Sequence, residues 1–244
     1  MDQDNLIIVS EPCPYLPGKT ATAEVLQTSK GLDHYEELIP QGWRRSGSIL
    51  YRYRCEGCFR CIPIRIPASQ IDGGKRLSRL LNLNSDLSLN LLPSRFNLEH
   101  FRLYEKYIRA RHPETEFSDE VGYRDMIDSP LTAITEYRDT GGKLCGAGIV
   151  DVLPMGLSSV YFIFDPDEGR RSLGYYSVYL ESALALSMGK TYYYMGFWVP
   201  GAPKMDYKAD FQPFHLAVGR GSSPWMEFHD KTHALDWLST SSQR

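Results

Sequence analysis

A helical period in the apolar positions predicts several helices, of which one is especially clear. Asn97 is a good N-cap, and an acidic residue follows in the first turn. Phe101, Tyr104 and Ile108 then recur at helical spacing and predict a stripe that faces the core. We expect this helix to end near His112-Pro113. Other helices are predicted over residues 75–81, 119–127 and 175–188.

Alternating apolar and polar positions predict strands between these helices. Residues 133–137 and 144–153 form a predicted hairpin around a turn at 139–142. Further strands are predicted over residues 48–54, 62–66, 158–164 and 191–195, whereas the first forty residues are turn-rich. Strands followed by a packed helix and another strand are typical of an α+β fold. The order resembles an N-acetyltransferase-like mixed sheet flanked by helices.

Composition and charge narrow the class of protein. The chain has 244 residues, of which 42% are hydrophobic and 23% charged, as in a soluble globular protein. No apolar run reaches the ~18 residues of a membrane span, and Met1–Val9 lacks the basic residues of a signal peptide. We therefore expect a cytoplasmic protein that does not bind membranes.

The net charge of −3 conceals a basic region. Residues 42–111 carry 14 Lys and Arg against 5 Asp and Glu. Such a region favours a polyanion such as nucleic acid as partner; an unevenly charged solvated surface is the alternative.

An acidic turn follows the predicted strand 158–164. Asp165 and Glu168 are candidates to accept a proton from an attacking amine, and Asp167 is predicted to cap the turn. Ser172 and Gly174 then enter a helix, whose first N–H groups are free to bind an anion. The alternative is a turn and cap with no chemical role.

Two other segments carry candidate binding residues. Tyr194 lies in the aromatic run 192–198, and Lys204, Tyr207 and Lys208 follow it. These residue types stack on bases and neutralise phosphates, although a buried strand followed by a surface loop has the same pattern. Upstream lie arginines and cysteines: Arg44, Arg45, Arg65, Cys13, Cys55, Cys58 and Cys61.

These arginines suit carboxylates and phosphates, because the guanidinium group binds two oxygens at once. Cys55, Cys58 and Cys61 have the spacing of zinc or iron–sulfur ligands, and Cys13 is a candidate fourth thiolate. Buried, unreactive thiols are the favoured alternative.

Six motifs in this order resemble the aminoacyl-tRNA–protein transferases of the N-degron pathway, which include bacterial aspartate/glutamate leucyltransferases and eukaryotic arginyltransferases. The motifs are Cys13–Pro17, Gly42–Gly47, the segment from Cys55 to Arg65, Asp165–Glu168, Ser172–Gly174 and Lys204–Lys208.

The resemblance implies transfer of an amino acid from charged tRNA to the α-amine of proteins that begin with Asp or Glu, which marks them for degradation. No cofactor is required, because the aminoacyl ester is already activated. It also implies an N-terminal region (1–70), an N-acetyltransferase-like domain (71–217) and a tail (218–244).

Roles follow for the candidate residues. Asp165 is the first choice as catalytic base and Glu168 the second, and the three arginines are expected to bind the acidic acceptor. Binding of the aminoacyl group or the tRNA is assigned to Ser172, Gly174, Glu181, Tyr194, Lys204, Tyr207 and Lys208.

Two departures bear on specificity. Leu16 and Arg60 stand where eukaryotic members have cysteines, so the resemblance does not favour zinc or an iron–sulfur cluster. Glu181 follows Gly174 by two helical turns and is a candidate partner for an arginyl guanidinium; a solvated Glu181 is the alternative. On this basis arginine is slightly favoured over leucine as the transferred amino acid.

Two other functions fit less well. An acetyl-CoA N-acetyltransferase needs a glycine-rich pyrophosphate loop, and Arg170–Tyr175 contains a single glycine. An RNA-binding module built on the cysteine segment would bind RNA without consuming charged tRNA.

Overall fold

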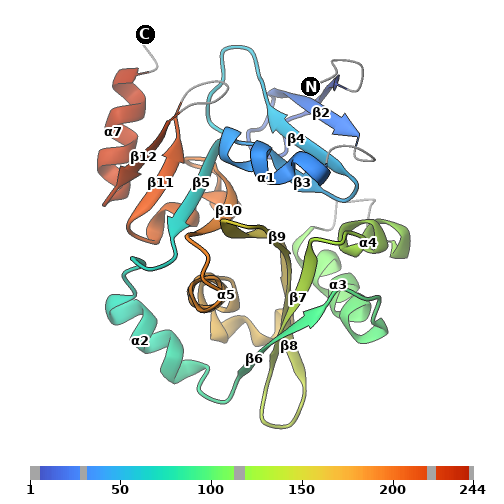
Figure 1. Ribbon diagram of the computed structural model, residues 1–244. Helices are drawn as coiled ribbons and strands as arrows, with labels where there is room; N and C mark the ends of the chain where they lie inside the picture. The colour runs from blue at the N-terminus through green and yellow to red at the C-terminus, as the bar shows by residue number, and fades with distance from the viewer. Residues whose placement is uncertain (1–5, 28–31, 113–118, 219–223, 242–244) are drawn as a thin grey trace. The chain divides into compact units, whose positions relative to one another are not determined.

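The computed structural model describes residues 6–27, 32–112, 119–218 and 224–241 (Figure 1). The chain forms two compact units. Unit 1 comprises Met1–Asp72 and Tyr194–Arg244, and unit 2 comprises Gly73–Tyr193. The chain passes from unit 2 to unit 1 within strand β10 (Tyr192–Trp198). Across the described residues, every helix is too short or too polar to span a lipid bilayer.

Unit 2 is built on an antiparallel meander of four strands: β6 (Ser88–Pro93), β7 (Thr132–Arg138), β8 (Leu144–Val152) and β9 (Gly156–Phe164). The hairpin between β7 and β8 turns at residues 139–142, as predicted. Gly142 has a φ of 83°, a conformation that glycine adopts without strain, and its N–H donates to the carbonyl of Asp139.

Helices cover both faces of this meander. Helix α3 (Leu98–Arg111) and helix α4 (Glu120–Ile127) pack on one face, where Ile134 of β7 joins their core. Thr135 is the next residue along β7 and therefore points to the opposite face. There it contacts Glu181 of helix α5 (Leu173–Ser187). Helix α2 (Gly74–Leu83) precedes β6.

Unit 1 contains two groups of strands. The first is an antiparallel sheet in the order β1-β2-β4-β3, with β1 at Leu6–Pro12, β2 at Thr20–Gln27, β4 at Ile49–Tyr53 and β3 at Arg44–Ser46. In the second, β10 neighbours β5 (Ile62–Pro67), which pairs with β11 (Phe214–Ala217) and then β12 (Trp225–Phe228).

Short helices complete unit 1. They are α1 (Tyr35–Leu38), α6 (Pro203–Asp206), the 3-10 helix η5 (Tyr207–Asp210) and the C-terminal α7 (Lys231–Ser241). Trp237 of α7 packs against Phe228 of β12, with ring centroids 6.1 Å apart. Two further 3-10 turns flank α1, η2 (Leu32–His34) and η3 (Ile39–Gln41).

The α+β class is confirmed, and so are most of the predicted elements. Asn97 caps α3 by accepting from the N–H of Glu99, and the predicted core residues Tyr104 and Ile108 are buried. The turn-rich interpretation of the first forty residues is wrong, because β1 and β2 form there. The tail after residue 218 contains β12 and α7. The predicted division into domains stays a prediction, although residues 194–217 belong to unit 1.

Candidate active site

Asp165, the first choice as catalytic base, begins the acidic turn in unit 2. It follows β9 and caps the 3-10 helix η4 (Pro166–Arg171): its carboxylate accepts a hydrogen bond of 3.0 Å from the backbone N–H of Asp167. The prediction that Asp167 is the cap is therefore wrong. Pro166 is the first helical residue, where its missing N–H costs nothing, so the cap falls on the residue before it.

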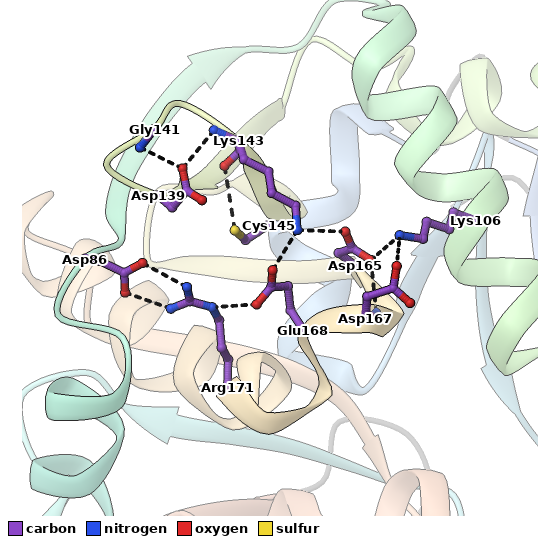
Figure 2. Close-up of polar contacts among 10 residues, drawn as sticks. All are labelled: Asp86, Lys106, Asp139, Gly141, Lys143, Cys145, Asp165, Asp167, Glu168 and Arg171. Atoms are coloured by element: carbon purple, nitrogen blue, oxygen red, sulfur yellow. Dashed lines mark hydrogen bonds and ion pairs between the residues drawn. The ribbon is translucent and has the colours of Figure 1, made fainter.

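Two lysines hold the carboxylate of Asp165 (Figure 2). Nζ of Lys106, from α3, lies 2.5 Å from Oδ1 of Asp165 and 2.6 Å from Oδ2 of Asp167. Nζ of Lys143 lies 3.3 Å from Oδ2 of Asp165. Burial alone would raise the pKa of Asp165, but hydrogen bonds from Lys106, the N–H of Asp167 and Lys143 outweigh it and lower the pKa. Asp165 is thus ionised at neutral pH.

Glu168 extends the network. It accepts hydrogen bonds from Lys143 at 2.6 Å and from Nε of Arg171 at 2.8 Å, and these two partners lower its pKa. Nη1 and Nη2 of Arg171 donate to the two carboxylate oxygens of Asp86, at 2.7 and 2.8 Å. A carboxylate whose pKa lies far below neutrality is a weak proton acceptor. The assignment of Asp165 or Glu168 as base stays a prediction.

Ser172 and Gly174 lie at the start of α5. Ser172 has a left-handed backbone with a φ of 54°, and its carbonyl accepts from the N–H groups of Tyr175 and Tyr176. The Ser172 side chain makes no capping hydrogen bond. An open depression beside it is lined by Arg79, Asn82, Leu83, Arg170 and Ser172. The role of this region in binding the aminoacyl group or the tRNA stays a prediction.

Glu181 is buried, and the solvated alternative is wrong. Its carboxyl group accepts hydrogen bonds from three hydroxyl groups: Tyr193 at 2.6 Å, Thr135 at 2.8 Å and Tyr137 at 3.3 Å. Burial raises the pKa of Glu181, and the three hydroxyl groups oppose this only in part. Gly148 on β8 leaves the room for the carboxyl group, because a Cβ there would lie 2.3 Å from its Oε1.

In unit 1, two of the three candidate arginines meet at Tyr194. The Arg44 guanidinium lies 5.3 Å from the centroid of the Tyr194 ring, and Nη1 of Arg65 lies 3.4 Å from the Tyr194 hydroxyl. Arg65 also covers the ring of Trp225 at 4.2 Å. Arg45 follows Arg44 on β3 and bonds the carbonyl of Gly47 at 2.8 Å instead.

The residues predicted to bind tRNA in unit 1 have different surroundings. Lys204 is exposed on α6, whereas Lys208 on η5 is half-buried. Nζ of Lys208 lies beside Gly196, 3.4 Å from where a Cβ would stand. Tyr207 packs edge-on against Phe211, at 6.2 Å between ring centroids. The assignment of Lys204, Tyr207 and Lys208 to tRNA binding stays a prediction.

The four candidate ligands Cys13, Cys55, Cys58 and Cys61 lie in unit 1, whereas Cys145 lies in unit 2. Burial and the neighbouring thiols of Cys55, Cys13 and Cys58 raise the pKa of Cys61 to about 12. Within the described ranges, no three Cys, His, Asp or Glu side chains are placed to hold a metal ion. That these four cysteines bind no zinc or iron–sulfur cluster stays a prediction. That the enzyme requires no cofactor stays a prediction.

Sequence reasoning missed the partners that define these sites. Lys106 and Lys143 were not singled out, although the basic region includes the first of them. Thr135 and Tyr137 gave no signal, because each lies in a strand whose pattern indicates only burial. Tyr193 was part of the aromatic run 192–198 but was given no role of its own. The contacts of these residues with Glu181 depend on the packing of α5 against β7 and β10.

Comparison with known proteins agrees with this arrangement. Residues 11–79 match the family model "Arginine-tRNA-protein transferase, N terminus", and residues 99–218 match "Arginine-tRNA-protein transferase, C terminus". The chain is 38% identical to an aspartate/glutamate leucyltransferase of Teredinibacter turnerae, over 86% of this chain and 88% of that protein. It is 36% identical to one of Pseudomonas fluorescens, over 85% and 91%.

These matches define the class first: the protein is an aminoacyltransferase. The chain belongs to the arginine-tRNA-protein transferase family, as the six motifs predicted. Among solved structures, FemX aligns with a TM-score of 0.47 and 8% identity over 89% of this chain and 74% of that chain, too distant to bear on function.

Proposed function

We propose that the protein transfers leucine from leucyl-tRNA to the α-amine of proteins that begin with Asp or Glu. The curated relatives are named aspartate/glutamate leucyltransferases, which supports both the donor and the acceptor. Binding of charged tRNA and of an acidic N-terminus is part of this proposal.

The surroundings of Glu181 carry the choice of leucine. An arginyl side chain needs an anion, because an unpaired buried charge is costly. Glu181, the sequence-derived candidate for that anion, already accepts three hydrogen bonds from hydroxyl groups of its own unit, and burial favours its neutral form. An apolar leucyl side chain makes no such demand. The slight preference for arginine therefore loses its main support.

The chemistry is acyl transfer. The α-amine attacks the ester carbonyl, a peptide bond forms, and the bond to the ribose oxygen breaks. The α-ammonium loses one proton before it attacks, because only the neutral amine has a lone pair. The nitrogen loses a second proton as the peptide bond forms, and the leaving ribose oxygen takes one up. Asp165 is proposed to accept the first proton. Its lysine partners keep it ionised but weaken it as a base, so orientation of the two substrates carries much of the rate.

The test is a transfer assay with labelled Leu-tRNA and Arg-tRNA in parallel, with peptides that begin with Asp, Glu or Ala. We expect leucine to reach the Asp and Glu peptides and neither amino acid to reach the Ala peptide. The family model carries the arginine name, so arginyl transfer is the second candidate. Preferential transfer from Arg-tRNA would refute the choice of leucine.

A further inference from the structure

Arg44 is a buried cation that has no carboxylate partner among the residues that the structure describes. The side chain is 3% exposed, and Nη2 donates to the carbonyls of Ile64 at 3.3 Å and Gly196 at 3.0 Å. Nε and Nη1 are buried and have no acceptor among the described residues. Burial lowers the pKa of Arg44, and only tyrosine hydroxyls oppose this effect. Buried charges in proteins are normally paired, so this one indicates a ligand that brings the missing anion.

Lys208 adds a second cation at the same place. Its Nζ lies beside Gly196, whose carbonyl binds Arg44. In the described part of the chain, neither Lys208 nor Arg44 forms an ion pair with a carboxylate. Lys208 is half-buried, whereas Arg44 is almost fully buried. Gly196 has a φ of 82°, a conformation that favours glycine and leaves space for the lysine.

We infer that Arg44 and Lys208 together bind the side-chain carboxylate of the acceptor's N-terminal Asp or Glu, and that this binding is coupled to uptake of a proton by Lys208. The inference rests on the proposed function for the identity of the acceptor. It moves Lys208 from the predicted tRNA contacts to the acceptor site.

A carboxylate fits this place better than a tRNA phosphate. A carboxylate is small enough to be enclosed beside a buried cation, whereas the phosphates of an RNA backbone are contacted from the protein surface. Tyrosine hydroxyls from three elements lie near Arg44: Tyr35 of α1, Tyr51 of β4 and Tyr194 of β10, the last of which also contacts Arg65. Burial raises the pKa of Tyr51, so its hydroxyl stays neutral.

The coupling to protons follows from the surroundings of Lys208. Burial and the charge of Arg44 lower the pKa of Lys208 to about 7. The empty site therefore carries a lysine that is about half neutral at pH 7. A carboxylate favours the charged form, so its binding draws in about half a proton at pH 7. Above pH 7 the affinity falls, because the lysine must first take up that proton.

Calorimetry can test the inference without any tRNA. Binding of a peptide that begins with Asp is compared with binding of one that begins with Asn, from pH 7 to pH 9, in buffers of different ionisation heat. The α-amine of the Asp peptide is more basic than that of the Asn peptide, because of the neighbouring carboxylate, so both free peptides are titrated and the contribution of each amine is subtracted. For the wild-type protein we expect the preference for Asp to fall about fivefold between pH 7 and pH 8, with measurable proton uptake.

Two variants of Lys208 decide the outcome. Lys208→Arg keeps the charge at all these pH values, so the preference for Asp should persist and the extra proton uptake should vanish. In Lys208→Met, the preference for the Asp peptide over the Asn peptide should fall at least tenfold at pH 7. The control is Lys19→Arg, an exposed lysine of unit 1, which should behave as the wild type.

An Asp preference and pH dependence unchanged in Lys208→Met would overturn the inference. So would a Lys208→Met variant that keeps its peptide affinity but binds uncharged tRNA more weakly and with a smaller salt slope, since Lys208 would then contact a phosphate. A wild-type protein that shows the coupled binding but transfers no amino acid would instead refute the proposed function alone.

Discussion

The variant Glu181→Gln tests whether Glu181 is a buried neutral acid or the partner of an arginyl guanidinium group. The three hydroxyl contacts are placed around the carboxyl group, and an amide of the same shape preserves the packing and the bonds to Oε1. Because burial raises the pKa of Glu181 in the folded protein, the folded state binds the proton more tightly than the unfolded chain. Stability must therefore fall as pH rises from the unfolded pKa towards the folded one.

The size of this effect follows from linkage. Within that window each pH unit lowers the free energy of unfolding of the wild type by about 1.4 kcal/mol, and the Gln variant lacks this contribution. Urea unfolding of both proteins at pH 5, 6 and 7 measures the difference. We expect the free energy of unfolding of the Gln variant to rise relative to that of the wild type as the pH rises. We also expect the variant to keep its leucyl transfer.

A difference in stability that does not change with pH would show that Glu181 titrates alike in both states, and the neutral form would be wrong. Loss of arginyl transfer in the Gln variant, from a wild type that performs it, would identify Glu181 as the guanidinium partner and refute the choice of leucine.

Two further changes test the acidic turn and the space around Glu181. Gly148→Ala places a Cβ 2.3 Å from both Oε1 of Glu181 and Oγ1 of Thr135, so we expect a loss of about 1–3 kcal/mol in urea unfolding. Gly174→Ala, in the first turn of α5 and with no atom within 4 Å of the new Cβ, should instead gain about 0.4–1 kcal/mol, because alanine restricts the unfolded chain; equal effects would contradict the packing. Asp165→Asn keeps a good N-cap but removes the charge, so single-turnover transfer with pre-bound tRNA should fall at least about tenfold at pH 7. Because the pKa of Asp165 is lowered, its titration should leave no inflection between pH 5 and pH 9, and an unchanged rate in Asp165→Asn would make the residue a structural cap.

Local signals account for the elements that could be predicted. The cap at Asn97 and the residues that follow at helical spacing lie within a few turns of each other, so α3 is encoded by its own segment. β1 could not be predicted in the same way. Its apolar residues Leu6, Ile7 and Ile8 are adjacent and all exposed, so no alternation marks a buried face. The strand forms through its antiparallel pairing with β2, the next strand along the chain, and its own residues give no sign of that pairing.

The same distinction applies to the candidate site. Asp165 could be placed at a strand end, because the apolar run before it and Pro166 after it are neighbours in the sequence. The lysines that lower its pKa could not, since Lys106 comes from α3 and Lys143 from β7–β8. Whether a carboxylate is free or paired with a cation depends on how the chain packs. That pairing sets the pKa of the carboxylate and so its strength as a base.

The cations of the basic region, residues 42–111, differ in whether a carboxylate pairs with them. Arg52 and Arg54 share Glu24 of β2, and Lys106 binds two aspartates, so each of these cations has a carboxylate partner within its own unit. Arg44 has none among the described residues, although it is the more deeply buried and its charge the more costly to leave alone. A count of charges in the sequence cannot distinguish paired from unpaired cations, because it gives every cation the same weight. On the sequence alone, the excess of Lys and Arg in residues 42–111 favours nucleic acid as a partner. It includes Arg44, which we infer is paired instead with the N-terminal Asp or Glu of an acceptor protein.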